Sequence, residues 1–270
     1  MLIPILGILT TTAGPGGDAG LPPGGELAKA ALEATPRHAE YVDVPYAGGP
    51  PLRSFVVYPE RKDKAPVVVL VHEIYGLTDW LRAVADRLAA DGFIAVAPDL
   101  ISGLGPGGGG TEAAKSLDDV RALIRGLPDE EAHRRIAAVR AWALARPAAT
   151  DMSAILGFCW GGARSFEQAA REPGWDAAVV FYGTNPEPAS LRKLKVPVLG
   201  LYAGDDARVN VSIEPAAAEA KKRGRAYEYA IYPGAGHGFL RLQSDRDGAN
   251  LSATRQAWPR VIEFLRRNLE

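Results

Sequence analysis

The 270-residue sequence contains one cysteine and four histidines. A single cysteine cannot form an intramolecular disulfide, and no paired Cys/His spacing or H-E-x-x-H segment is present, so we expect neither a metal site nor a cofactor. Basic and acidic residues nearly cancel, 31 against 32, which leaves no global field to favour nucleic acid or an anionic membrane surface. No apolar run reaches the roughly 18 residues of a membrane span. We therefore expect the binding partner to be a small molecule.

The N-terminal part differs in composition from the rest of the chain. Residues 10–36 are rich in Gly, Pro, Ala and Thr, so we expect a flexible, extended leader over 1–36 and one domain over 37–270. The apolar start, Met1–Leu9, lacks the basic region and the A-x-A site of a signal peptide. We favour a soluble, cytoplasmic protein, with export as the alternative if this start is a signal remnant. A monomer or a small homo-oligomer is expected.

From about Ala39 onward, strand and helix patterns alternate. Alternation of this kind is typical of a mostly parallel sheet with helices on both faces, and chemistry in such sheets gathers at the carboxyl ends of the strands. The pattern predicts eight strands, at 41–45, 54–58, 65–71, 93–97, 153–158, 177–182, 196–202 and 227–232. It predicts helices at about 77–91, 129–146, 161–171, 213–223 and 252–269, with Pro259 beginning, breaking or kinking the last one.

The segment GFCWGG at 157–162 lies between a predicted strand and a predicted helix. It fits the G-x-nucleophile-x-G elbow, with cysteine where serine is commoner. Glycines are required because the turn is too tight for side chains, and the helix N-terminus favours a thiolate. A buried cysteine in a glycine-rich turn is the alternative. The elbow therefore makes Cys159 a candidate nucleophile.

Two further groups complete a candidate catalytic triad. His237 lies in a glycine-rich loop directly after a predicted strand, whereas His38 and His133 are expected on the surface and His72 in a structural role. Two aspartates, Asp205 and Asp206, follow another strand. The chain order of nucleophile, acid and histidine is that of the α/β-hydrolases.

An oxyanion also requires hydrogen-bond donors. The N–H of Trp160, which follows the nucleophile, is one candidate, and the N–H of Ile74, in the loop after the 65–71 strand, is the second. The glycine-rich stretch at 103–110 resembles a dinucleotide-binding fingerprint, but Pro106 interrupts it and it does not directly follow a strand. A flexible rim over the pocket is expected there instead.

Four segments together resemble the dienelactone hydrolase family. They are HEIYG at 72–76, GFCWGG at 157–162, the Gly204-x-Asp206 loop and AGHGF at 235–239. The resemblance covers the chain from about residue 40 and implies an α/β-hydrolase fold. It selects Asp206 over Asp205 as the acid.

The resemblance also implies roles for residues around the triad. Glu73 would contact the resting thiol and help to deprotonate it, Arg241 would hold a substrate carboxylate, and Tyr75 and Tyr182 would line the pocket. The family's second carboxylate-binding arginine is missing from residues 101–110, which puts a dienelactone substrate in doubt. We therefore expect a hydrolase of small lactones or short-chain esters. The alternatives are a general carboxylesterase for uncharged esters and a catalytically silent binding module.

Overall fold

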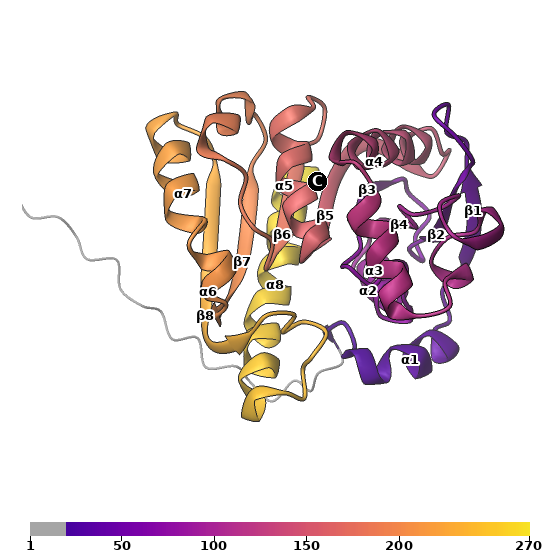
Figure 1. The fold of residues 1–270 in the computed structure, drawn as a ribbon, viewed down its shortest axis with the longest axis horizontal. Helices are drawn as coiled ribbons and strands as arrows, with labels where there is room; N and C mark the ends of the chain where they lie inside the picture. The colour runs from indigo at the N-terminus through magenta and orange to yellow at the C-terminus, as the bar shows by residue number, and fades with distance from the viewer. Residues whose placement is uncertain (1–19) are drawn as a thin grey trace, which may run out of the picture.

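The structure is a computed structural model that describes residues 20–270. Its centre is an eight-stranded sheet with the strand order β1-β2-β4-β3-β5-β6-β7-β8 (Figure 1). Strands β3 to β8 run parallel, and β1 and β2 are joined to the edge of β4 by antiparallel pairing. The strands are β1 (Ala39–Val44), β2 (Leu52–Val57), β3 (Ala65–Val71), β4 (Ile94–Pro98), β5 (Ala149–Phe158), β6 (Ala177–Phe181), β7 (Val198–Asp205) and β8 (Tyr227–Gly236). The predicted α/β fold is confirmed.

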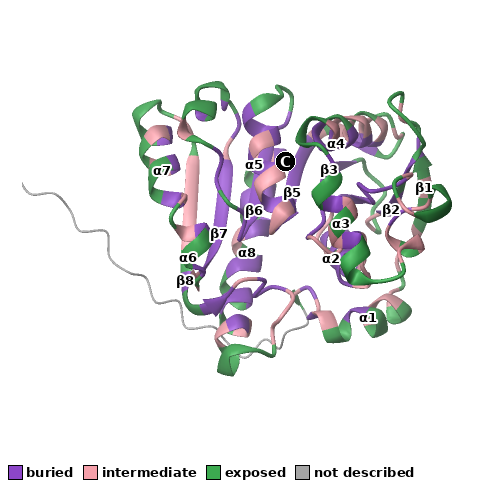
Figure 2. Ribbon diagram, viewed as in Figure 1, coloured by how far each residue is buried: buried purple, intermediate pink, exposed green. Residues whose placement is uncertain are grey.

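Helices cover both faces of this sheet. On one face α2 (Asp79–Ala90) and α8 (Ala249–Leu269) pack on alternate strand residues, such as Val68 and Leu70 of β3. The intervening residues, such as Val67 and Val69, face α4 (Asp129–Leu144), α5 (Trp160–Arg171) and α7 (Ile213–Lys222). This division follows from the two-residue period of a strand. Figure 2 shows the result: the central strands are buried, while the helices keep exposed outer faces.

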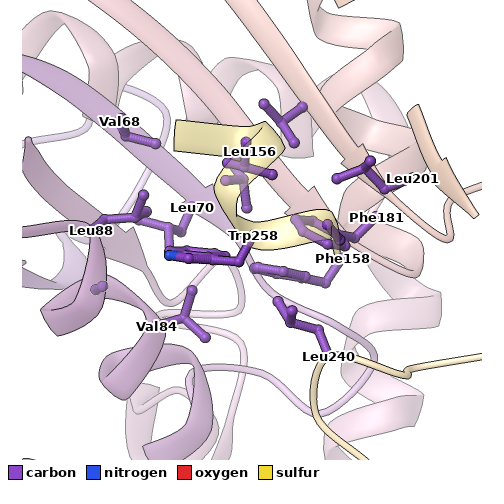
Figure 3. Close-up of a cluster of buried hydrophobic side chains, with 14 of the residues drawn as sticks. Val68, Leu70, Val84, Leu88, Leu156, Phe158, Phe181, Leu201, Leu240 and Trp258 are labelled. Atoms are coloured by element: carbon purple, nitrogen blue, oxygen red, sulfur yellow. The ribbon is translucent and has the colours of Figure 1, made fainter. Parts of the chain in front are cut away.

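Trp258 of α8 lies in the core on the α2 side, where it packs among aliphatic and aromatic side chains of the sheet (Figure 3). It is 1% exposed, and its indole Nε1 donates to Asp91 Oδ2 at 3.1 Å. The buried polar tip of the ring is thus satisfied, as a buried tryptophan requires. The helix continues through Pro259, so that proline neither begins nor ends it.

The N-terminal segment differs from the prediction. Residues 20–36 do not form an extended leader: they contain a 3-10 turn, η2 (Gly25–Leu27), and helix α1 (Ala28–Ala34), which packs on α2. The Gly25 N–H donates to the carbonyl oxygen of Arg241 at 2.8 Å, and Gln243 Nε2 donates to the Pro22 carbonyl at 2.9 Å. Alanine-rich sequence forms helix readily once one face is buried. The earlier part of the predicted leader lies outside the described residues.

The connection after β4 is built of short turns and one helix. These are η3 (Pro106–Gly108), η4 (Thr111–Ala113) and α3 (Leu117–Gly126). Buried Asp99 holds this connection in place, because Oδ2 accepts from the Thr111 N–H at 2.6 Å and Oδ1 from its hydroxyl at 2.9 Å. The stretch expected as a flexible rim is therefore fastened at its C-terminal end. The remaining short elements are η5 (Pro188–Lys193), α6 (Ala207–Asn210) and η6 (Arg246–Gly248).

Among residues 20–270, no helix has the length and apolar character needed to cross a membrane.

Candidate active site

Cys159 lies at the sharp turn between β5 and α5. Its backbone has φ 55° and ψ −116°, a region that is strained for a residue with a side chain. The flanking glycines make the turn sterically possible, since a Cβ at Gly157 would collide with the Gly161 carbonyl and one at Gly161 with the Val71 carbonyl. The turn places the thiol at the carboxyl edge of the sheet, at the N-terminus of a 12-residue helix.

His237 and Asp206 meet at the same edge, at the ends of the adjacent strands β8 and β7. The imidazole Nδ1 lies 2.5 Å from Asp206 Oδ2. The carboxylate is 6% exposed and the imidazole 32%, so the acid is sequestered while the base remains accessible. Asp205 points elsewhere: its exposed carboxylate accepts from Arg246 at 2.9 Å. Of the two aspartates, the one at His237 is Asp206.

The surroundings of Cys159 favour the neutral thiol. Burial raises the pKa of the Cys159 thiol to about 11, and the carboxylates of Glu73 and Asp206 add to this rise. A hydrogen bond from the Trp160 backbone N–H and the charge of Arg208 act in the opposite direction on the same pKa. A nucleophile in this state needs a base when its substrate arrives.

Glu73 follows β3 and is buried, with a side chain 4% exposed. Its hydrogen bond is to Arg241, whose Nε donates to Oε2 at 2.6 Å, and the Arg241 guanidinium lies 4.7 Å from the centre of the Tyr75 ring. Burial raises the pKa of Glu73, and Arg241 opposes that rise. Glu73 was expected to contact the resting thiol. Its carboxylate is instead hydrogen-bonded to Arg241, and its charge raises the pKa of Cys159.

Tyr182 follows β6 and is fully buried. Its ring centre lies 5.1 Å from that of His237, and its hydroxyl has no hydrogen-bond partner within residues 20–270. Its φ of 39° is a second strained backbone position at this edge.

A cleft of about 460 Å³ opens over the thiol. It brings together Ile74 and Trp160, the two predicted oxyanion donors, with Cys159 and Tyr182. Its other lining residues, which we did not predict, are Ala163, Arg164, Glu167, Thr184, Asn185 and Arg208. The sequence could have indicated Arg208, because it lies two positions after the predicted acid, Asp206. The others come from α5 and from the loop after β6, which carry no motif.

The other three histidines differ in their surroundings, and His38 is exposed, as predicted. His72 is structural, as predicted: it is buried, its Nδ1 lies 2.7 Å from the Glu73 carbonyl oxygen, and its Nε2 accepts from the Leu100 N–H at 3.3 Å. The prediction that His133 lies on the surface is wrong. It is 5% exposed, with Nδ1 at 2.5 Å from Gln168 Oε1, because α5 packs over the face of α4 that carries it.

The chain matches the model of the dienelactone hydrolase family over residues 52–269. It is 31% identical to a Saccharolobus solfataricus protein provisionally named a carboxymethylenebutenolidase, over 81% of this chain and 95% of that protein. It is 28% identical to the carboxymethylenebutenolidase of Pseudomonas sp. strain P51, over 84% and 95%. The solved structure of a Klebsiella pneumoniae protein, provisionally named a dienelactone hydrolase, superposes with a TM-score of 0.73 at 26% identity over 85% and 98%. The chain belongs to the dienelactone hydrolase family of the α/β-hydrolase superfamily, as its motifs predicted.

Proposed function

We propose that this hydrolase cleaves small lactones or short-chain esters through a covalent acyl-enzyme formed on Cys159. The observation that carries the proposal is the position of Cys159 on a strained elbow, at the sheet edge where His237 is hydrogen-bonded to Asp206. Family membership supports the hydrolytic chemistry, and the names of the relatives support a lactone or ester substrate.

In the proposed reaction, His237 accepts the thiol proton as the sulfur attacks the substrate carbonyl carbon. Asp206 keeps the imidazole in the tautomer whose Nε2 is free to accept that proton. The carbonyl oxygen becomes an oxyanion, for which the N–H groups of Trp160 and Ile74 are the donors. When the carbon–oxygen bond of the ester breaks, the imidazolium returns its proton to the leaving alkoxide.

The second half of the reaction regenerates the thiol. His237 removes a proton from water, and the resulting hydroxide attacks the thioester carbon. Collapse of this intermediate releases the carboxylic acid and returns a proton to sulfur. Because the pKa of the resting thiol is about 11, the free enzyme holds Cys159 in its protonated, poorly nucleophilic form.

Glu73, Arg241, Tyr75 and Tyr182 are the further residues to which the resemblance gives a role in the reaction. We assign Glu73 to thiol activation, as the family resemblance implies: in the resting enzyme its carboxylate is near enough to raise the pKa of Cys159, and the same group can accept the thiol proton when substrate binds. We assign the other three side chains to substrate contact. The charges of Glu73 and Arg241 cancel in their ion pair.

A second candidate is a general carboxylesterase that accepts uncharged short-chain esters. The observation that favours it is the engagement of Arg241 with Glu73, together with the absence of arginine from residues 101–110. A matched pair of acidic and neutral esters tests the second candidate, since a general carboxylesterase for uncharged esters should show no preference for the acidic member.

The test of the proposed function uses the single cysteine. One equivalent of iodoacetamide incorporated per chain should abolish hydrolysis of p-nitrophenyl acetate, and Cys159→Ala should be inactive with an unchanged circular dichroism spectrum. His38→Gln, which alters an exposed histidine away from the cleft, serves as the control. Full activity of purified Cys159→Ala would overturn the mechanism. Absence of any esterase activity in the wild type would favour a silent binding module.

A further inference from the structure

Arg208 is a cation on the wall of the cleft that holds Cys159. It lies in α6, two residues after Asp206, and is exposed. Within residues 20–270 its side chain takes part in no ion pair and no hydrogen bond. A guanidinium carries five N–H donors and always remains charged. An unpaired one beside a nucleophile can receive an anionic group.

The other arginines around the thiol are already neutralised. Arg164, on α5, lies 2.5 Å from Asp129 and 3.1 Å from Glu167. Arg241, which is not among the residues that line this cleft, is paired with the buried carboxylate of Glu73 at 2.6 Å. Among the described residues that line the cleft, Arg208 is therefore the charge without a counterion.

The backbone that carries Arg208 is well anchored. Val209, the next residue, is fully buried. Asn210 Nδ2 donates to the carbonyl oxygens of Ala203 at 2.9 Å and Gly204 at 3.3 Å, and the Asp206 carbonyl accepts from the N–H groups of Val209 and Asn210. These contacts fix the backbone at Arg208 relative to the loop that carries Asp206. Because its backbone is already fixed, Arg208 loses little backbone entropy when it binds a ligand.

We propose that Arg208 binds an anionic group of the substrate, such as a carboxylate, and that it determines the preference of the enzyme for acidic over neutral esters. The inference rests on the proposed hydrolysis at Cys159. It assigns charge selection to Arg208 in place of Arg241, to which the resemblance would give it. The lowering influence of Arg208 on the pKa of Cys159 supports its proximity to the reacting sulfur. Thr184, which also lines the cleft, carries a hydroxyl that can serve as a second donor.

The test compares two p-nitrophenyl esters of the same acyl chain, one charged and one neutral. Mono-p-nitrophenyl succinate carries a free carboxylate, and p-nitrophenyl methyl succinate has the same chain with that group methylated. For Arg208→Gln we expect kcat/KM on the acidic ester to fall about tenfold, the lower end for a charge-assisted hydrogen bond at an exposed site. The neutral ester should lose much less, since it is affected only through the influence of Arg208 on the thiol, so that the ratio of acidic to neutral kcat/KM falls. Arg208→Lys should retain part of the preference, and Arg208→Glu should discriminate against the acidic ester.

Two controls keep the result specific to the cleft. Arg223→Gln removes one positive charge at the end of α7, outside the cleft, and should leave the ratio of the two kcat/KM values unchanged. Raising the ionic strength to about 1 M shortens the screening length to about 3 Å, and it should reduce the acidic preference in the wild type but not in Arg208→Gln.

The outcomes distinguish this inference from the proposed function. If Arg208→Gln loses the same factor on both esters and its thiol reacts more slowly with iodoacetamide, Arg208 acts only on the thiol and the inference is wrong. Equal activity of wild type and Arg208→Gln on both esters would also overturn it, while leaving hydrolysis at Cys159 intact. If the wild type hydrolyses neither ester and Cys159→Ala behaves identically, the proposed function itself fails.

Discussion

Glu73 and Arg241 are 168 positions apart in the sequence, yet their side chains form an ion pair with 2.6 Å between Oε2 and Nε. The pair joins the loop after β3 to the loop that carries His237. Both partners are largely shielded, with side chains 4% and 22% exposed. Removal of one partner of such an ion pair strongly destabilises the folded protein, because the other charge then stays buried without compensation.

The first prediction concerns Arg241. Arg241→Met should leave Glu73 without its counterion, so that the pKa of Glu73, already raised by burial, rises further. We expect kcat/KM to fall by the same factor on acidic and neutral esters. The melting temperature should drop by an amount that corresponds to about 2–4 kcal/mol. Steady-state kinetics on the succinate pair and a thermal melt provide the measurements.

The double variant Arg241→Met/Glu73→Gln is the control for this prediction. It removes both charges and should recover most of the lost stability. A selective loss on the acidic ester alone would show instead that Arg241 holds the substrate carboxylate, and charge selection by Arg208 would then have to be abandoned.

The second prediction concerns the pH dependence of thiol reactivity. The Glu73 carboxylate raises the pKa of Cys159, second only to burial, to about 11. Glu73→Gln removes that charge, so the pKa of the thiol should fall and the thiolate should form at lower pH. We expect faster alkylation by iodoacetamide at pH near 8, with the rising limb of the rate profile shifted to lower pH. Turnover of esters should decline, because the proposed activating group is gone.

Glu112→Gln removes an exposed carboxylate outside the cleft and should reproduce the wild-type alkylation profile. If Glu73→Gln does the same, the carboxylate has no influence on the thiol and its assignment to thiol activation is wrong.

The third prediction uses the two neighbouring aspartates as a matched pair. Asp206→Asn should reduce kcat by about 10²-fold or more, because an amide cannot hold the imidazole in the productive tautomer. His237→Ala should reduce kcat further. Asp205→Asn should have little effect, since that carboxylate faces Arg246 on the surface. A large loss in Asp205→Asn with near-normal activity in Asp206→Asn would reverse the assignment of the acid.

The sequence predicted the sheet well because its signals are local. The β-branched run Ala65–Val71 became β3 with the expected bounds, and the glycine-rich elbow placed Cys159 between β5 and α5. The strands β5 and β8 are longer than predicted, reaching Ala149 and Gly236. Their extra residues gain hydrogen bonds from neighbouring strands, which a single-sequence pattern does not reveal.

Other features depended on tertiary contacts that the sequence does not display. Helix α1 forms in a segment of leader-like composition because it packs on α2. The burial of His133 depends on α5 covering α4. Similarly, an arginine such as Arg208 gives no periodic signal, and only the fold shows that Arg164 and Arg241 are neutralised while Arg208 is not.

The last prediction concerns the connection after β4, which was expected to be a flexible rim. The Thr111 hydroxyl donates to Asp99 Oδ1 at 2.9 Å and accepts from the Leu77 N–H at 3.0 Å, so it links this connection to the loop that follows the oxyanion segment. Thr111→Val keeps the shape of the side chain and removes both hydrogen bonds. We expect a loss of about 1–3 kcal/mol in the free energy of unfolding. Asp99 is 1% exposed, so water cannot supply a hydrogen bond to its carboxylate in place of the one that is lost.

Urea unfolding of the wild type, Thr111→Val and Thr111→Ser measures this loss. Thr111→Ser keeps the hydroxyl and should retain most of the stability, which separates the hydrogen bonds from the packing of the methyl group. Hydrogen exchange should become faster in residues 103–113 of Thr111→Val, since their anchor to Asp99 then depends on the Thr111 N–H alone. Equal stability and equal exchange in wild type and Thr111→Val would mean that the Thr111 hydroxyl does not hold the rim, and that the flexible loop expected from the glycine-rich sequence is the better description.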